Sequence, residues 1–194
     1  MNSDSTERFW TIPNVISLYR IFIFPLVLYL IIAGNEKLFS IFITINLISD
    51  ILDGWIARAF KMQTRIGARL DSWADLGTYL LAFIAVYVFK WNQLQPYSFT
   101  LIIFFVIRII SYAIVIIKFR GLIGLHTYLS KFTGYIQGAF IIALFLFNFY
   151  LWLYYFALLV GILDCVEEII IILIISTPMS NVKGLYWILK DKQK

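Results

Sequence analysis

Six long apolar stretches, separated by short polar segments, organise this chain of 194 residues. About 20 apolar residues in helical form cross a bilayer, so each stretch predicts a membrane-spanning helix. The predicted spans are approximately 14–33, 38–59, 67–89, 98–117, 132–148 and 155–176. The predicted connections are 34–37, 60–66, 90–97, 118–131 and 149–154, and no Gly or Pro marks the last of them.

The pattern predicts an all-α, polytopic membrane protein with six transmembrane helices, forming a single domain over residues 1–194. Composition agrees, because 62% of the residues are hydrophobic and 14% are charged, whereas soluble proteins average roughly 45–50% and about 25%. Residues 1–13 are expected to be a polar N-terminus with a short interfacial helix near Ser5–Trp10. Residues 178–194 are expected to be a basic tail.

The formal net charge is +5. No basic run with interleaved aromatic residues stands outside the apolar stretches, which argues against nucleic acid and favours contact with anionic lipid headgroups. With six spans, most Lys and Arg residues fall on one side together with both termini. The positive-inside rule then places the termini and the acidic stretch described next in the cytoplasm, at a bacterial or archaeal cell membrane.

The one dense cluster of charge runs from Asp50 to Asp75. Asp50 and Asp53 are three residues apart near the end of one predicted helix, and Asp71 and Asp75 are four apart at the start of the next. Each pair shares a helix face, so two packed helices would bring four carboxylates together. Carboxylates gathered in apolar surroundings need cations, and one or two Mg²⁺ or Mn²⁺ ions suit oxygen ligands.

Small residues and one arginine lie among these acids. Gly54, Ala57 and Gly67 leave room for a close approach to the backbone, and Arg58 offers a planar fork for phosphate. In a soluble protein, acids at this spacing usually form a solvated helix face. Here the flanking segments 41–49 and 76–89 carry no charge, and charge between membrane spans is costly, which favours a functional site for phosphate.

Other charged residues inside the spans allow two interpretations each. Arg20 either extends to the membrane surface or contacts a phosphate, and Arg108 faces either a substrate phosphate or an acid of another helix. A second acidic cluster is predicted to pair with buried cations, although contact of its two glutamates with substrate is an alternative. Its members are Asp164, Glu167 and Glu168.

The acidic stretch resembles the signature of the CDP-alcohol phosphatidyltransferase family, D-x2-D-G-x2-A-R-x8-G-x3-D-x3-D. Every fixed position is filled at the right spacing, by Asp50, Asp53, Gly54, Ala57, Arg58, Gly67, Asp71 and Asp75. A fainter similarity near the N-terminus involves Pro13, Asn14 and Arg20.

The resemblance implies an enzyme that transfers a phosphatidyl group from CDP-diacylglycerol to a small alcohol and releases CMP. It also implies two Mg²⁺ or Mn²⁺ ions, a homodimer, and Asp75 as the general base. The implied metal ligands are Asp50, Asp53, Asp71 and Asp75. The implied contacts to the CDP moiety are Asp53, Gly54, Ala57, Arg58, Gly67 and Asp71.

The acceptor alcohol is predicted from the cations. A phosphorylated acceptor needs its own basic pocket, for which the candidates are Arg108, Lys118, Arg120 and Lys131. These favour glycerol 3-phosphate, with inositol phosphate, inositol and serine as alternatives. Leu76 follows Asp75 where glycerophosphate-using relatives often have lysine, which argues the other way. A metal-cation transporter and a non-enzymatic membrane scaffold are the alternative functions.

Overall fold

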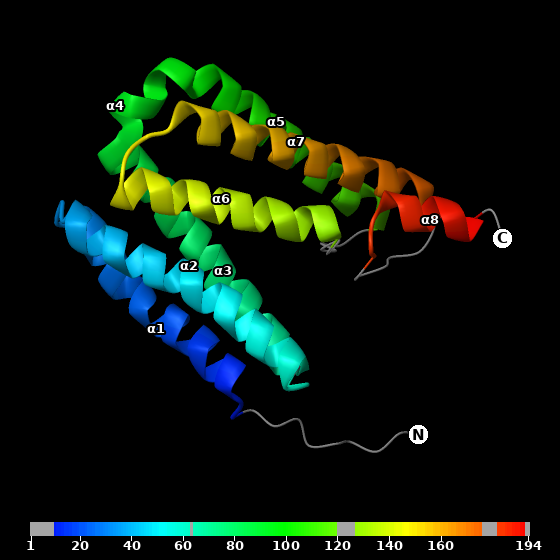
Figure 1. The fold of residues 1–194 in the computed structure, drawn as a ribbon, viewed down its shortest axis with the longest axis horizontal. Coiled ribbons are helices and arrows are strands. Elements are labelled where there is room, and N and C mark those ends of the chain that lie inside the picture. The colour runs from blue at the N-terminus through cyan, green and yellow to red at the C-terminus, as the bar shows by residue number, and fades with distance from the viewer. Residues whose placement is uncertain (1–9, 63, 120–126, 176–181, 193–194) are drawn as a thin grey trace. The chain divides into compact units, whose positions relative to one another are not determined.

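The computed structural model describes residues 10–62, 64–119, 127–175 and 182–192. The chain divides into two compact units, Met1–Asn92 and Gln93–Lys194, and each unit has its own set of packed helices (Figure 1). Within the described ranges every regular element is a helix. This confirms the predicted all-α class, while the prediction of a single domain stays a prediction.

Three long helices build the first unit: α1 (Ile12–Ile32), α2 (Glu36–Ala59) and α3 (Arg65–Ala85). α1 packs against both α2 and α3, the two helices that carry the acidic pairs, and these also contact each other. Burial of apolar side chains from all three helices forms the core of this unit. The most buried are Val27, Ile31, Phe39, Ile43, Leu81 and Ala85.

A tight turn reverses the chain between α1 and α2, as the sequence predicts. Gly34 has φ +70°, a backbone conformation that glycine adopts at little cost. The Asn35 N–H donates to Leu30 O at 2.9 Å and the Gly34 N–H donates to Ile31 O at 3.1 Å, which is a Schellman motif. The Asn35 side chain then caps α2 by accepting from the Leu38 N–H at 3.1 Å.

The chain stays helical after α3, so the predicted loop at 90–97 is wrong. A π-helical segment (Val86–Lys90) leads into α4 (Trp91–Leu94), a 3₁₀ turn (Gln95–Tyr97) and then α5 (Ser98–Phe119). Pro96 lies in the first turn of the 3₁₀ segment. Proline is tolerated there because the N–H groups of a first turn have no partner within the helix.

The second unit contains α5, α6 (Tyr128–Leu146), α7 (Leu151–Ile174) and α8 (Leu185–Lys192). α7 packs against both α5 and α6. The break between α6 and α7 confirms the predicted separation of the fifth and sixth spans. The break lies a few residues earlier in the chain than the predicted connection at 149–154. An apolar cluster joins α5 and α7 to the chain before α8, and its buried members are Val115, Ile171, Ile172, Ile175 and Val182.

The helix α8 was not predicted, because the basic tail shows too few apolar residues for a span. Leu185 and Ile188, three residues apart on α8, pack against the same apolar cluster. The predicted interfacial helix near Ser5–Trp10 falls outside the described residues except for Trp10, which is not helical.

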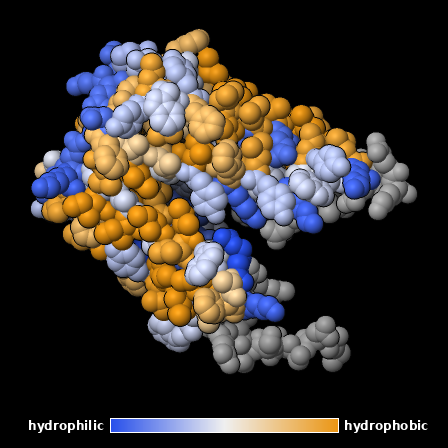
Figure 2. Space-filling view, in the orientation of Figure 1, coloured by the Kyte–Doolittle hydropathy of each residue, from blue (hydrophilic) through white to orange (hydrophobic). Residues whose placement is uncertain are grey.

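Exposed apolar side chains cover the long helices, as Figure 2 shows for one face. Four helical stretches of the described chain are long and apolar enough to cross a membrane: Ile12–Ile32, Glu36–Ala59, Arg69–Phe119 and Tyr128–Leu146. The third has 51 residues and covers α3 to α5. The protein is therefore an integral membrane protein, and the count of six crossings stays a prediction.

Candidate functional site

The acidic stretch occupies neighbouring parts of α2 and α3. Asp50 and Asp53 lie towards the end of α2, and Asp71 and Asp75 lie towards the start of α3. One carboxylate oxygen from each of Asp50, Asp53 and Asp71 lies within 4.8 Å of the other two. The predicted convergence of the two helix ends is thus confirmed for these three residues.

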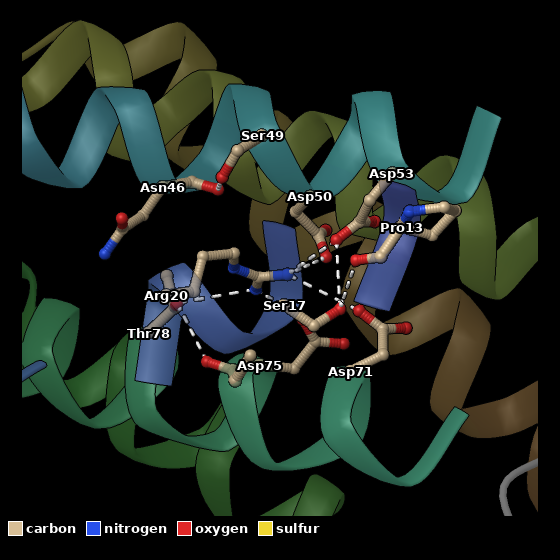
Figure 3. Close-up of polar contacts among 11 residues, drawn as sticks. Pro13, Ser17, Arg20, Asn46, Ser49, Asp50, Asp53, Asp71, Asp75 and Thr78 are labelled. Carbon is tan, nitrogen blue, oxygen red and sulfur yellow. Dashed lines mark hydrogen bonds and ion pairs between the residues drawn. The ribbon is translucent and has the colours of Figure 1, made fainter. Parts of the chain in front are cut away.

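The side chain of Arg20, from α1, lies between the acids (Figure 3). Its Nη1 donates to Asp50 Oδ1 at 2.7 Å and to Asp71 Oδ1 at 3.4 Å, and lies 3.6 Å from Asp53 Oδ2. Its Nη2 donates to Asp75 Oδ1 at 2.6 Å. Because this guanidinium is buried among four carboxyl groups, the interpretation that it extends to the membrane surface is wrong, while its contact with a phosphate stays a prediction.

Two hydroxyl groups that the sequence analysis missed complete these contacts. Ser17 Oγ donates to Asp53 Oδ2 at 3.3 Å, and Thr78 Oγ1 accepts from Arg20 Nη2 at 3.5 Å. A signal was present: Ser17 and Arg20 are three residues apart on α1, and Thr78 is three residues after Asp75 on α3. Polar residues that continue the face of a motif along an apolar helix point to the same site.

The carboxyl groups differ in exposure in a way that opens the site on one side. The side chains of Asp50, Asp71 and Asp75 are 38%, 44% and 37% exposed, whereas those of Arg20 and Asp53 are 1% and 4% exposed. Three converging carboxylate oxygens with an open side form a donor set that suits a hard divalent cation. The residues present therefore fit Mg²⁺ or Mn²⁺.

Gly67 lies where α1 meets the start of α3. A Cβ atom at this position would lie 2.3 Å from Asn14 Oδ1 and 2.8 Å from Thr64 Oγ1. Thr64 caps α3 by accepting from the Gly67 N–H at 2.9 Å, and Asn14 Nδ2 donates to the same hydroxyl at 3.4 Å. In this structure the missing side chain of Gly67 accommodates Asn14, and the predicted contact with CDP stays a prediction.

The remaining motif residues lie on α2. A Cβ atom at Gly54 would lie 3.4 Å from Arg58 Nη1, so the arginine side chain folds back over the glycine one turn earlier. Arg58 is exposed and Ala57 is half-buried. The guanidinium of Arg58 is therefore accessible at the same end of α2 as Asp53.

The second unit has its own acid–arginine cluster. Arg108 Nη2 donates to Asp164 Oδ2 at 2.8 Å, and Nη1 donates to Glu168 Oε2 at 3.5 Å. Ser111 Oγ also donates to Glu168 Oε2, at 2.7 Å. This confirms the predicted pairing of Asp164 and Glu168 with a buried cation. For Arg108 it confirms the alternative of an acid from another helix.

Glu167 has a structural role that the sequence did not specify. Its Oε2 accepts from Thr127 Oγ1 at 2.9 Å, and its Oε1 accepts from the Leu185 N–H at 3.0 Å. Thr127 caps α6 and Leu185 begins α8. A single carboxylate on α7 therefore joins the starts of two other helices.

The other acceptor candidates also belong to the second unit. Lys118 Nζ donates to Ile172 O at 2.7 Å and to Leu173 O at 3.2 Å, near the end of α7. Cations favour that position because helix C-termini carry partial negative charge. Lys131 is exposed, with its Nζ 5.8 Å from the Tyr128 ring centroid. Arg120 lies outside the described residues.

Comparison with known proteins places the acid cluster in a known class. The sequence profile described as CDP-alcohol phosphatidyltransferase matches residues 10–163, which include all four aspartates. The chain belongs to this family. It is therefore a membrane phosphatidyltransferase of phospholipid biosynthesis that uses CDP-diacylglycerol and an alcohol acceptor. The family depends on divalent cations, and these findings set aside the transporter and scaffold alternatives.

Similar proteins come from several organisms. A CDP-diacylglycerol--glycerol-3-phosphate 3-phosphatidyltransferase of Aquifex aeolicus is 27% identical over 180 residues, covering 93% of this chain and 99% of that protein. The cardiolipin synthase (CMP-forming) of Homo sapiens is 39% identical over 70 residues, covering 36% of this chain and 23% of that protein. The Rattus norvegicus protein of that name is 36% identical over 74 residues, covering 38% and 24%. No solved structure matches significantly.

Proposed function

We propose that this protein transfers the phosphatidyl group of CDP-diacylglycerol to glycerol 3-phosphate at the α2–α3 acid cluster. The observation that carries the proposal is the approach of Asp50, Asp53 and Asp71, whose carboxylate oxygens lie within 4.8 Å of one another beside an open side. Such a donor set holds Mg²⁺ or Mn²⁺, and two ions would match the negative charge of a diphosphate. When bound, the ions supply neutralisation of the phosphate oxygens.

Asp75 is the proposed general base. It is the acid of the cluster that contacts Nη2 rather than Nη1 of Arg20, and its side chain is partly exposed. In the reaction the hydroxyl oxygen of the acceptor forms a bond to the phosphatidyl phosphorus, and the bond from that phosphorus to the CMP oxygen breaks. Asp75 takes the hydroxyl proton, and CMP leaves with the bridging oxygen.

The CDP moiety is proposed to bind along the same end of α2. Arg58 is exposed one turn beyond Gly54, where its planar fork suits phosphate oxygens. The proposed set of contacts is Asp53, Gly54, Ala57, Arg58, Gly67 and Asp71. Binding energy from the nucleotide would orient the diphosphate for in-line attack.

Glycerol 3-phosphate is the proposed acceptor because the Aquifex relative that covers nearly the whole chain is named for it. Among the basic candidates predicted for its phosphate, Arg108 already bonds to Asp164 and Glu168, whereas the roles of Lys118, Arg120 and Lys131 stay predictions. The relatives with higher identity over the shorter segment support a second candidate, a CMP-forming cardiolipin synthase. Cardiolipin results when the accepting hydroxyl belongs to phosphatidylglycerol.

The proposed orientation in the membrane follows from the distribution of Lys and Arg residues. Basic residues gather on the predicted side that holds both termini, which supports a cytoplasmic active site in a bacterial or archaeal cell membrane. A homodimer is also proposed, from the family resemblance.

The reaction is tested with purified protein, CDP-diacylglycerol and Mg²⁺ or Mn²⁺. Separate samples receive glycerol 3-phosphate, phosphatidylglycerol, inositol phosphate, inositol or serine, and CMP release and the lipid product are followed by mass spectrometry. We expect metal-dependent CMP release with glycerol 3-phosphate. Release with phosphatidylglycerol alone supports the second candidate, and release with no acceptor contradicts the proposed reaction.

The residue roles are tested with amide variants of matched size. Asp75→Asn is expected to keep CDP binding in calorimetry and to lose turnover. Asp53→Asn is expected to lose metal and CDP binding together. Glu36→Gln is the control, because it changes a half-buried carboxylate at the opposite end of α2 that pairs with Lys90. Wild-type turnover by Asp75→Asn would remove the base assignment.

A further inference from the structure

Arg20 occupies the place of a cation within the acid cluster. Its Nη1 lies 2.7, 3.6 and 3.4 Å from one oxygen each of Asp50, Asp53 and Asp71. These are the three residues whose oxygens converge into a candidate cation site. One nitrogen that contacts three carboxylates neutralises part of their mutual repulsion, so Arg20 itself helps to hold the ends of α2 and α3 together.

In the same position, the guanidinium of Arg20 would repel a bound metal ion. A divalent ion held by these three carboxylates would lie close to the guanidinium, and like charges repel strongly where water is scarce. The side chain of Arg20 is 1% exposed, so little solvent screens it. Binding of the ion therefore requires the guanidinium to give up some of the oxygens that it holds.

A second set of partners lies deeper in the first unit. Among the described residues, Arg20 Nε and Asn46 Oδ1 are the buried side-chain polar atoms that have no hydrogen-bond partner. One is a donor and the other an acceptor. Asn46 precedes Asp50 by four residues on the same face of α2, and its amide lies on the Arg20 side of that helix (Figure 3). Thr78, 3.5 Å from Nη2, belongs to the same buried layer.

We propose that Arg20 has two positions: one among the carboxylates when the site is free of metal, and one against Asn46 and Thr78 when a divalent ion is bound. The second position satisfies Nε and Asn46 Oδ1, whose unpaired burial is unfavourable in the first. Arg20 is thus a positioning residue that keeps the site assembled between turnovers. The inference rests on the proposed metal ligands Asp50, Asp53 and Asp71.

The alternative is a fixed Arg20 that only joins three helices. The two descriptions differ in what happens to metal affinity when the guanidinium is removed. A competing cation weakens metal binding, so its removal strengthens binding. A fixed structural residue supports the ligand geometry, so its removal weakens binding.

The experiment measures Mn²⁺ binding by calorimetry and thermal unfolding with EDTA or Mn²⁺, both without substrate. We expect Arg20→Gln to unfold at a lower temperature than the wild type in EDTA. We also expect it to bind Mn²⁺ at least about tenfold more tightly, so that Mn²⁺ raises its unfolding temperature by more than it raises that of the wild type. Arg20→Lys keeps the positive charge and should stay within about threefold of wild-type affinity. Lys37→Gln removes an exposed positive charge at the other end of α2 and should also stay within about threefold.

Asn46→Leu tests the second position separately. We expect it to weaken Mn²⁺ binding by at least about threefold when Arg20 is present, and to have no effect in the Arg20→Gln background. If Arg20→Gln does not fold, unchanged Mn²⁺ affinity in Asn46→Leu overturns the proposal. Unchanged or weaker binding in a folded Arg20→Gln overturns it as well. Failure of the wild type to bind Mn²⁺ instead removes the proposed metal site, and this inference with it.

Discussion

A methyl group at position 67 has no room between α1 and α3, and this makes Gly67→Ala a sharp test of the packing. The new Cβ would lie 2.3 Å from Asn14 Oδ1, whereas C···O contacts normally reach about 3.3 Å. Asn14 is 2% exposed, so it cannot move into solvent. Either its side chain or α1 itself must withdraw by roughly 1 Å.

The expected cost follows from two contacts. Overpacking a dense site costs typically about 1–3 kcal/mol. The new Cβ would also lie 2.8 Å from Thr64 Oγ1, the cap of α3, and loss of a cap costs about 1 kcal/mol. We therefore expect a loss of about 2–4 kcal/mol in the free energy of unfolding. If α1 rather than the Asn14 side chain withdraws, Arg20 moves with the helix, and a 1 Å displacement should also lower turnover about 100-fold.

The assay combines denaturant unfolding in detergent micelles with metal-dependent CMP release. Gly138→Ala is the control, because a Cβ at that position of α6 meets nothing within 4 Å. Alanine in a helix is favoured over glycine by about 1 kcal/mol, so this control should be neutral or more stable. Wild-type stability in Gly67→Ala would refute the packing argument. Weaker CDP binding with unchanged stability would favour the predicted nucleotide contact instead.

Three further predictions concern stability. Arg108→Met leaves two buried carboxyl groups without their cation and should cost about 3–5 kcal/mol, measured by unfolding against the exposed-site control Arg58→Met. Glu167→Ala removes the acceptor shared by the start of α8 and the cap of α6, so hydrogen exchange in α8 should rise, with a loss of about 1–3 kcal/mol. Lys61 has φ +53°, so Lys61→Gly should raise the free energy of unfolding by up to about 1 kcal/mol; a loss would show that the lysine makes a compensating contact.

The long helices could be predicted because the length of each apolar stretch indicates a membrane-spanning helix. All six predicted spans overlap long helices, and Gly34 marked the first turn correctly. The convergence of the acids could also be predicted. The end of one helix lies beside the start of the next when the two helices pack, and this brings Asp50 and Asp53 close to Asp71. The segment around Pro96 was predicted wrongly because proline breaks a helix interior but is tolerated in a first turn, and sequence alone did not distinguish the two.

The partners of the buried arginines could not be predicted with the same certainty. A sequence shows that Arg20 lies in an apolar helix, but its contacts depend on which face of α1 packs against α2 and α3. That choice is made by packing over the whole helix, including the close approach at Gly67. For Arg108, acids at suitable positions were visible in the sequence, and the alternative of substrate contact was equally consistent with the pattern.

The two acid–arginine clusters show which physical property separates a ligand site from a structural ion pair. In the second unit, Asp164 and Glu168 are 7% and 10% exposed, and both bond to Arg108. In the first unit, one guanidinium faces four carboxyl groups, and two of them, Asp50 and Asp71, are 38% and 44% exposed. A closed cluster with few acids satisfies itself, whereas an open cluster with excess acids needs further cations. Charge excess together with exposure, rather than the presence of buried charge, therefore distinguishes the α2–α3 end, where metal and diphosphate are proposed to bind.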